Sequence, residues 1–269
     1  MSFLDQILAA KHAEIAAARR LRPQADLERL AAKRDDFRGF AAALARPGVR
    51  IIAEIKRASP SLGDIRPDLD PADLAAAYEA GGAAALSVLT EPAFFKGSAQ
   101  DLKRARRVTD LPVLRKDFIL DPYQVYETAA MGADAMLLIV RILDDDALAS
   151  LTALAQGIGL ECLVEIHDEA DARRILDLAP PVVGINNRDL AHFRTDTSQA
   201  ARLANRLPRG SAPVAASGIH SADDIRQALA SGLRRFLIGE TLVRAPDPAE
   251  LLRQWTTIRI PEVRGQMPE

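Results

Sequence analysis

The amino-acid sequence predicts an α/β fold, a (β/α)8 TIM barrel with an N-terminal helical extension. Its 269 residues suit this fold, which commonly runs to about 250 residues. From residue 51 onward, eight short apolar runs alternate with segments of helical periodicity. Their starts lie 22 to 33 residues apart, which leaves room for one helix in each connection and implies parallel neighbours. A doubly wound sheet is the alternative, but eight units of such even length favour the barrel.

Residues 1–48 precede this repeat and predict a helical extension. The stretch SFLDQILAAKHAEIAAARR has apolar residues on one helical face, with Ser2 and Asp5 at capping positions, and should end before Pro23. We expect this helix to cover one end of the barrel; a helix that binds a partner is the alternative. Because no Gly/Ser-rich linker interrupts the chain, residues 1–269 are predicted to form a single barrel domain that includes this extension.

The eight predicted strands follow in order along the rest of the chain. They read IIAEIK from residue 51, AALSVLT from 84, PVLRKD from 112, DAMLLIV from 134, LECLVEI from 160, VVGINN from 182, PVAAS from 213 and RFLIG from 235. Capping residues mark two of the helices between them. One predicted helix opens at Asp70 and ends at Gly81, another opens at Asp121 and ends at Gly132, and proline follows each aspartate.

The composition argues against several classes of protein. Basic residues number 35 and acidic residues 37, with no basic block, so nucleic-acid binding is not expected. The single cysteine, Cys162, lies in an apolar run and predicts a core thiol without a disulfide framework, which indicates a cytoplasmic protein. No apolar run reaches the roughly 18 residues of a membrane span. The four histidines lack metal-ligand spacing, so no metal is predicted.

Polar side chains gather at the carboxyl ends of the predicted strands, where barrels of this kind perform chemistry. In IIAEIKRASPS, Glu54 and Lys56 lie two positions apart and therefore share one face of the first strand. Lys116 ends the third strand, and Glu165 and Asn186 end the fifth and sixth. We expect all five side chains to meet at one mouth.

The two lysines favour acid–base chemistry over plain positive charge. The chain has 29 arginines and six lysines, yet Lys56 and Lys116 both lie at strand ends. Lysine can release its proton when desolvated, whereas arginine effectively cannot. Structural alternatives stay open. Glu54 and Lys56 could form an internal ion pair, Lys116 could pair with Asp117, and Glu165 could cap the helix that follows it.

Glycines after the seventh and eighth strands indicate a phosphate subsite. The segments ASGIHS (216–221) and LIGETL (237–242) place Gly218 and Gly239 where backbone N–H groups can approach an anion at a helix N-terminus. Ordinary βα turns are the alternative.

Together these motifs resemble the indole-3-glycerol phosphate synthase family. The stretch IIAEIKRASPSLGDI has its Glu-x-Lys-x-x-Ser-Pro-Ser pattern, and VLTEPAFFKGS, PVLRKDFILDPYQ, ADAMLLIV, LVEIHD, GINNRDL and LIGETL follow in family order. The resemblance implies a carboxy-lyase of tryptophan biosynthesis that needs no cofactor. It would convert 1-(2-carboxyphenylamino)-1-deoxyribulose 5-phosphate to indole-3-glycerol phosphate with loss of carbon dioxide and water. We expect a cytoplasmic monomer that binds this small molecule and neither nucleic acid nor membrane.

The resemblance also implies roles for individual residues. Lys116 matches the acid that protonates the ketose oxygen, with Lys56 beside it, and Glu165 and Glu54 match the groups for dehydration, with Lys56 assisting. The rest of the substrate, apart from its phosphate, corresponds to Asn186, Arg188, Ser59, Phe95 and Phe118. The phosphate is expected among Arg57, Ser217, Gly218, Gly239 and Glu240, the last through its backbone N–H alone.

One position departs from the family pattern. Ala216 stands in VAASGI where the family usually has glutamate. The alternative to an active synthase is therefore a catalytically weakened or non-catalytic phosphate-binding barrel. Another phosphate-binding barrel, phosphoribosylanthranilate isomerase, would need a cysteine at a strand end, whereas Cys162 lies mid-strand on the face opposite to Glu165.

Overall fold

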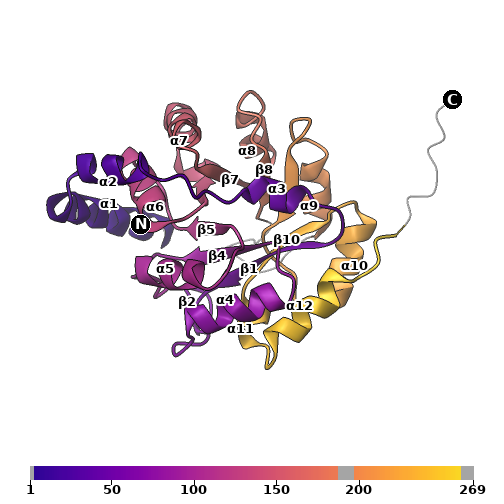
Figure 1. Ribbon diagram of the computed structural model, residues 1–269. Coiled ribbons are helices and arrows are strands. Elements are labelled where there is room, and N and C mark those ends of the chain that lie inside the picture. The colour runs from indigo at the N-terminus through magenta and orange to yellow at the C-terminus, as the bar shows by residue number, and fades with distance from the viewer. Residues whose placement is uncertain (1–2, 187–196, 262–269) are drawn as a thin grey trace.

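The computed structural model describes residues 3–186 and 197–261, with the side chains of 197–199 excepted. In this part of the chain, eight parallel strands close into a barrel in the order in which they occur in the sequence, and the last pairs with the first (Figure 1). The strands are β1 (Arg50–Ile55), β4 (Ala85–Leu89), β5 (Val113–Lys116), β6 (Ala135–Ile139), β7 (Glu161–Ile166), β8 (Val182–Ile185), β9 (Ala212–Ala215) and β10 (Arg235–Ile238). The predicted fold class is confirmed.

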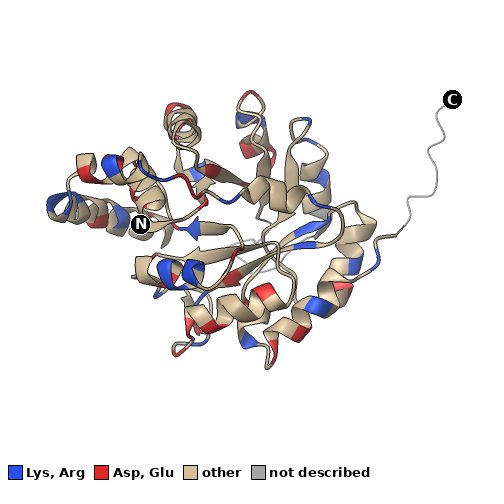
Figure 2. Ribbon diagram, in the orientation of Figure 1, with Lys and Arg blue, Asp and Glu red and all other residues tan. Residues whose placement is uncertain are grey.

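Helices follow the strands and form the outer layer. They are α4 (Pro71–Ala80), α5 (Ala99–Arg107), α6 (Pro122–Met131), the 3-10 helix η1 (Val140–Ile142), α7 (Asp145–Gly157), α8 (Glu169–Arg174), α9 (Thr197–Ala204), α10 (Ala222–Ala230), α11 (Glu240–Arg244) and α12 (Pro248–Thr256). The predicted caps are confirmed: Asp70 accepts from the N–H of Ala72 at 2.8 Å, and Gly132 ends α6 with φ of 94°. Figure 2 shows acidic and basic residues interspersed along the outer helices. Among the described residues, no helix is long and apolar enough to cross a membrane.

The barrel has two apolar cores because side chains alternate between the faces of each strand. Inward-facing residues such as Ile52, Leu137 and Leu163 fill the interior. Outward-facing residues, Cys162 among them, pack beneath the helices. Burial raises the pKa of the Cys162 thiol to about 12, which confirms it as an inert core residue.

The N-terminal extension forms three helices: α1 (Phe3–Leu21), α2 (Gln24–Ala31) and α3 (Phe40–Ala45). The predicted first helix is confirmed, and its first turns reach the carboxyl ends of the strands through Phe3, Leu4 and Ile7. The end at the strand starts is closed by α3, where Phe40 and Leu44 are fully buried in the interior core. Helix α1 runs outside the barrel near α6 (Figure 1), with Ile15 in one apolar cluster with Tyr123.

Asp134 at the start of β6 fastens the extension to the barrel. Its fully buried carboxylate accepts from Arg34 at 2.8 Å and from the backbone N–H of Arg38 at 2.9 Å, both in the segment between α2 and α3. On the barrel side it accepts from Arg106 at 2.5 Å and from the N–H of Val113 at 2.8 Å. One carboxylate thus satisfies two backbone donors and pairs with two buried guanidinium groups, whose other carboxylate partner is the exposed Asp36.

We expect Asp134→Ala to lower the free energy of unfolding by about 3–5 kcal/mol, because it leaves buried charges and donors without their partner. Urea denaturation followed by circular dichroism measures the change. Asp223→Ala is the control: Asp223 is exposed and pairs with Arg226 at 2.5 Å, so its removal should cost less than about 1 kcal/mol. Equal losses for the two variants would contradict this prediction.

Candidate active site

A cavity of about 540 Å³ lies at the carboxyl ends of the strands. Each of the eight strands contributes a lining residue at its end or just beyond it: Lys56, Leu89, Lys116, Ile139, Glu165, Asn186, Ala216 and Gly239. The charged residues expected at one mouth are therefore gathered there.

Glu54 and Lys56 form the ion pair that the structural alternative expected, and both also line the cavity, as the catalytic interpretation expected. The Glu54 Oε1 and Lys56 Nζ atoms are 2.9 Å apart, and the hydroxyl of Ser87 lies 3.4 Å from Glu54 Oε2. Burial by itself would raise the pKa of Glu54, but the charges of Lys56 and Lys116 outweigh it and hold that pKa below its usual value. A Cβ added to Gly239 would meet Glu54 Oε1 at 2.5 Å, so glycine leaves room for this carboxylate.

Glu165 and Lys116 face each other across the mouth. Lys116 Nζ lies 3.8 Å from Glu165 Oε2, and the side-chain amide of Asn186 donates to Glu165 Oε1 at 3.1 Å. Glu165 lines the cavity, and its buried Oε2 has no hydrogen-bond partner among the described residues.

Two structural alternatives are contradicted here. Asp117 is paired with Lys11 of α1 at 2.8 Å and with Arg115 at 3.0 Å, so it does not serve as the partner of Lys116. The cap of α8 is Asp168 rather than Glu165.

Apolar and small polar residues from the loops after β1, β4 and β5 line one side of the cavity. The rings of Phe95 and Phe118 have their centroids 6.2 Å apart, and both line the cavity together with Ser59. Ser59 belongs to a small antiparallel pair in the loop after β1, formed by β2 (Ala58–Ser59) and β3 (Gly63–Asp64). This wall can accept the flat apolar part of a ligand.

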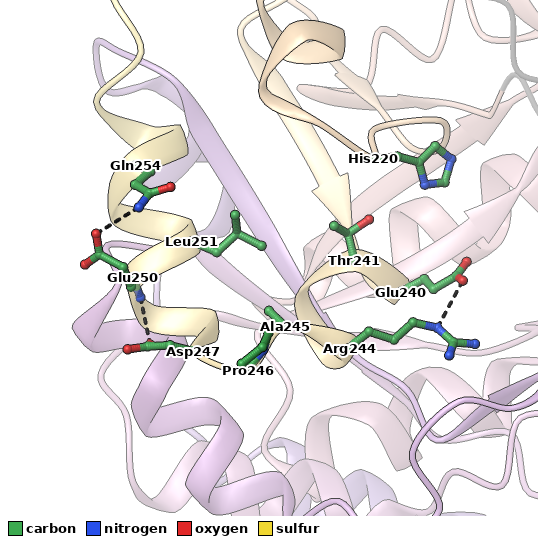
Figure 3. A pocket seen from close by; sticks show the side chains of 10 residues that line it. All are labelled: His220, Glu240, Thr241, Arg244, Ala245, Pro246, Asp247, Glu250, Leu251 and Gln254. Carbon is green, nitrogen blue, oxygen red and sulfur yellow. Dashed lines mark hydrogen bonds and ion pairs between the residues drawn. The ribbon is translucent and has the colours of Figure 1, made fainter.

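The two glycine loops lie side by side at the same mouth. Ser217, Gly218, Gly239 and Glu240 all line the cavity. Gly218 has φ of 82°, a conformation that favours glycine. The carboxylate of Glu240 pairs with Arg244 at 3.2 Å, beside a groove between α11 and α12 (Figure 3). The two loops therefore lie where the sequence predicts the phosphate, and the carboxylate of Glu240 is paired with a cation.

One predicted residue is not brought to the cavity, and another lies outside the described residues. Arg57 is absent from its lining; its guanidinium instead donates to Asp101 of α5 at 2.9 Å and to the carbonyl of Leu69 at 3.3 Å. Arg188 lies outside the described residues.

The cavity also includes side chains that sequence reasoning did not assign to the site. Phe3, Leu4 and Ile7 reach it from the first turns of α1. Arg141 and His167 line it after β6 and β7. His167 lies two positions beyond Glu165, so the same period of two that selected Glu165 could have found it. Nothing local in the sequence indicates that the tip of α1 reaches the mouth.

A closed barrel with paired lysines and carboxylates at its mouth is the arrangement of a (β/α)8 enzyme that works by acid–base chemistry. Among the described residues, no group of three His, Cys, Asp or Glu side chains is placed to hold a metal ion. A family model described as Indole-3-glycerol phosphate synthase matches residues 4–255. The chain belongs to this family.

Relatives support this family, and a solved structure supports the fold. The indole-3-glycerol phosphate synthase of Desulfosudis oleivorans is 54% identical over 258 residues, which cover 94% of this chain and 98% of the relative. That of Aromatoleum aromaticum is 47% identical over 254 residues, 93% of this chain and 97% of the relative. Orotidine 5'-phosphate decarboxylase from Pyrococcus horikoshii matches with a TM-score of 0.59 over 77% of this chain and 97% of its own, at 12% identity. At that identity the likeness supports the fold alone.

Proposed function

We propose that the residues of this cavity carry out the carboxy-lyase reaction of the family, a step of tryptophan biosynthesis. The substrate is 1-(2-carboxyphenylamino)-1-deoxyribulose 5-phosphate, and the products are indole-3-glycerol phosphate, carbon dioxide and water. The observation that carries the proposal is the convergence of Glu54, Lys56, Lys116 and Glu165 in one cavity, with an aromatic wall and two glycine loops. Such a cavity supplies both acids and bases to one bound molecule.

Ring closure needs an acid. The aryl carbon that bears the carboxylate attacks the ketose carbonyl, and the carbonyl oxygen takes a proton as the new carbon–carbon bond forms. We assign this proton to Lys116, with Lys56 as a second cation near the developing charge. Loss of carbon dioxide then returns the bonding electrons to the ring, which restores its aromaticity.

Dehydration needs a base and an acid, for which we assign Glu165 and Glu54, with Lys56 assisting. Glu165 removes the proton from carbon; its Oε2 has no hydrogen-bond partner among the described residues and lies 3.8 Å from Lys116 Nζ. The pKa of Glu54 is held below its usual value, so Glu54 is a carboxylate and Lys56, 2.9 Å away, carries the proton of this pair. The Glu54–Lys56 pair gives that proton to the departing hydroxyl.

The remaining assignments concern binding. We place the aromatic end of the substrate at Asn186, Ser59, Phe95 and Phe118, its carboxylate at Arg188, and its phosphate at Ser217, Gly218, Gly239 and the N–H of Glu240. Arg57, paired with Asp101, is left out of the phosphate site.

We further propose that residues 1–269 act as a single-domain monomer in the cytoplasm. One copy suffices for the site, because all eight strands of the same chain line the cavity. The single, buried thiol supports the compartment.

The test is to incubate the purified protein with the carboxyphenylamino ketose phosphate and follow the appearance of indole fluorescence. We expect turnover without added cofactor. A weakened or non-catalytic barrel, favoured by Ala216, would bind the phosphate but show little or no fluorescence change.

Ala216 lines the cavity on the strand next to Asn186, so a side chain added there points at the substrate. We expect Ala216→Glu to raise turnover by about tenfold, less than the hundredfold or more that a full acid–base group contributes. The measurement is kcat of the variant beside the parent, with a thermal melt to verify the fold. An unchanged or lower kcat would show that this chain is adapted to the small residue.

We expect inorganic phosphate to compete with the substrate, because both would use the backbone N–H groups of the glycine loops. Phosphate at increasing concentration should raise KM and leave kcat unchanged. Chloride at matched ionic strength is the control, since it separates specific binding from screening. Equal inhibition by the two salts would remove the phosphate assignment.

A further inference from the structure

His167 lies between two carboxylates at the edge of the cavity. It follows β7 directly, and its largely buried ring has Nε2 at 3.4 Å from Glu165 Oε1. On its other side, Nδ1 is 3.6 Å from Oδ2 of Asp171 in α8. The ring therefore lies between Oε1 of Glu165 and the carboxylate of Asp171 in α8, at distances slightly longer than a hydrogen bond on both sides.

Asp171 is itself held in place. Its carboxylate accepts the backbone N–H of His167 at 2.9 Å, and Arg141 of η1 lies 3.9 Å away. Burial would raise the pKa of Asp171, but the hydrogen bonds from His167 and the charge of Arg141 outweigh it and keep that pKa below its usual value. A carboxylate fixed by two elements can therefore orient the ring, as in other carboxylate–histidine pairs.

The two oxygens of Glu165 differ in their surroundings. Oε1 has Asn186 at 3.1 Å and His167 at 3.4 Å, whereas Oε2 has no hydrogen-bond partner among the described residues and faces Lys116 at 3.8 Å. Holding one oxygen of a carboxylate fixes the direction of the other. We propose that His167 is a positioning residue that holds Glu165 with Oε2 directed at Lys116 and the substrate. The proposal rests on the proposed function, in which Glu165 transfers a proton.

Two substitutions separate the two nitrogens of the ring. The amide nitrogen of glutamine reaches the place of Nε2, which faces Glu165, and that of asparagine reaches the place of Nδ1, which faces Asp171. We expect His167→Asn to lower kcat by about 10- to 100-fold with KM within a few-fold of the parent, the usual effect of a misplaced catalytic group. We expect kcat of His167→Gln to be at least about tenfold higher than kcat of His167→Asn.

A purely structural role predicts the reverse order. If His167 served only to fasten Asp171 and α8, asparagine would be the better replacement, and the thermal melts of the two variants would differ in the same direction as kcat. His12→Asn is the control, because His12 is exposed on α1. A kcat of His167→Gln at or below that of His167→Asn overturns the proposal.

Crystal structures of the two variants give a readout that does not depend on turnover. In His167→Asn we expect Glu165 Oε2 to turn away from Lys116, and in His167→Gln to keep its direction. An unmoved carboxylate in His167→Asn would refute the inference even if the parent showed no turnover. If the parent turns the substrate over and His167→Asn has the same kcat, this inference is refuted and the proposed function still stands.

Discussion

Lys116→Arg is expected to fold normally and to lose ring closure by about 10²- to 10⁴-fold, the usual contribution of a general acid. Arginine keeps the positive charge and most of the stem, so it should preserve attraction of the anionic substrate and the contact with Glu165, 3.8 Å away in the parent. It cannot serve as the acid, because a guanidinium holds its proton too tightly near neutral pH.

The measurement is kcat and substrate affinity beside the parent, with a thermal melt for folding. Affinity should fall far less than kcat, since the proposed phosphate site is on the loops after β9 and β10, which line the cavity away from Lys116 on β5. Lys33→Arg, an exposed lysine that does not line the cavity, is the matched control and should leave kcat unchanged. Turnover of Lys116→Arg within a few-fold of the parent would transfer the acid role to Lys56.

Glu165→Gln should have an effect of similar size, a loss of about 10²- to 10⁴-fold in kcat. Glutamine has almost the same shape, and its carbonyl can still accept from Asn186 at the position of Oε1. The amide cannot give or take a proton, so dehydration should fail while binding continues. Because glutamine fills the same buried space and keeps the hydrogen bond to Asn186, we expect the fold to be preserved, which a thermal melt checks.

Single-turnover kinetics locate the affected step. We expect carbon dioxide to be released by Glu165→Gln faster than indole fluorescence develops, since the carboxyl group is lost before dehydration. Glu169→Gln is the control, an exposed position on α8. If carbon dioxide release slowed as much as fluorescence, Glu165 would have to act at ring closure as well.

The barrel and most of its mouth follow from local patterns in the sequence. Eight apolar runs at even spacing dictate eight parallel strands, and such strands end at one rim. Side chains two positions apart share one face of a strand, and this predicts that Glu54 and Lys56 point the same way. In the structure the two side chains are in contact. The same two rules bring Lys116, Glu165 and Asn186 to the cavity.

Contacts between residues far apart in the sequence are decided by the tertiary structure. No local pattern links Arg57 with Asp101, Lys11 with Asp117, or the tip of α1 with the mouth. Likewise α3 closes the barrel at the strand starts because Phe40 and Leu44 fit the interior core. Periodicity fixes the face of an element that is buried, because it depends only on neighbours along the chain. The choice among buried partners depends on the distance and charge of groups far apart in sequence, and these are set only when the barrel closes.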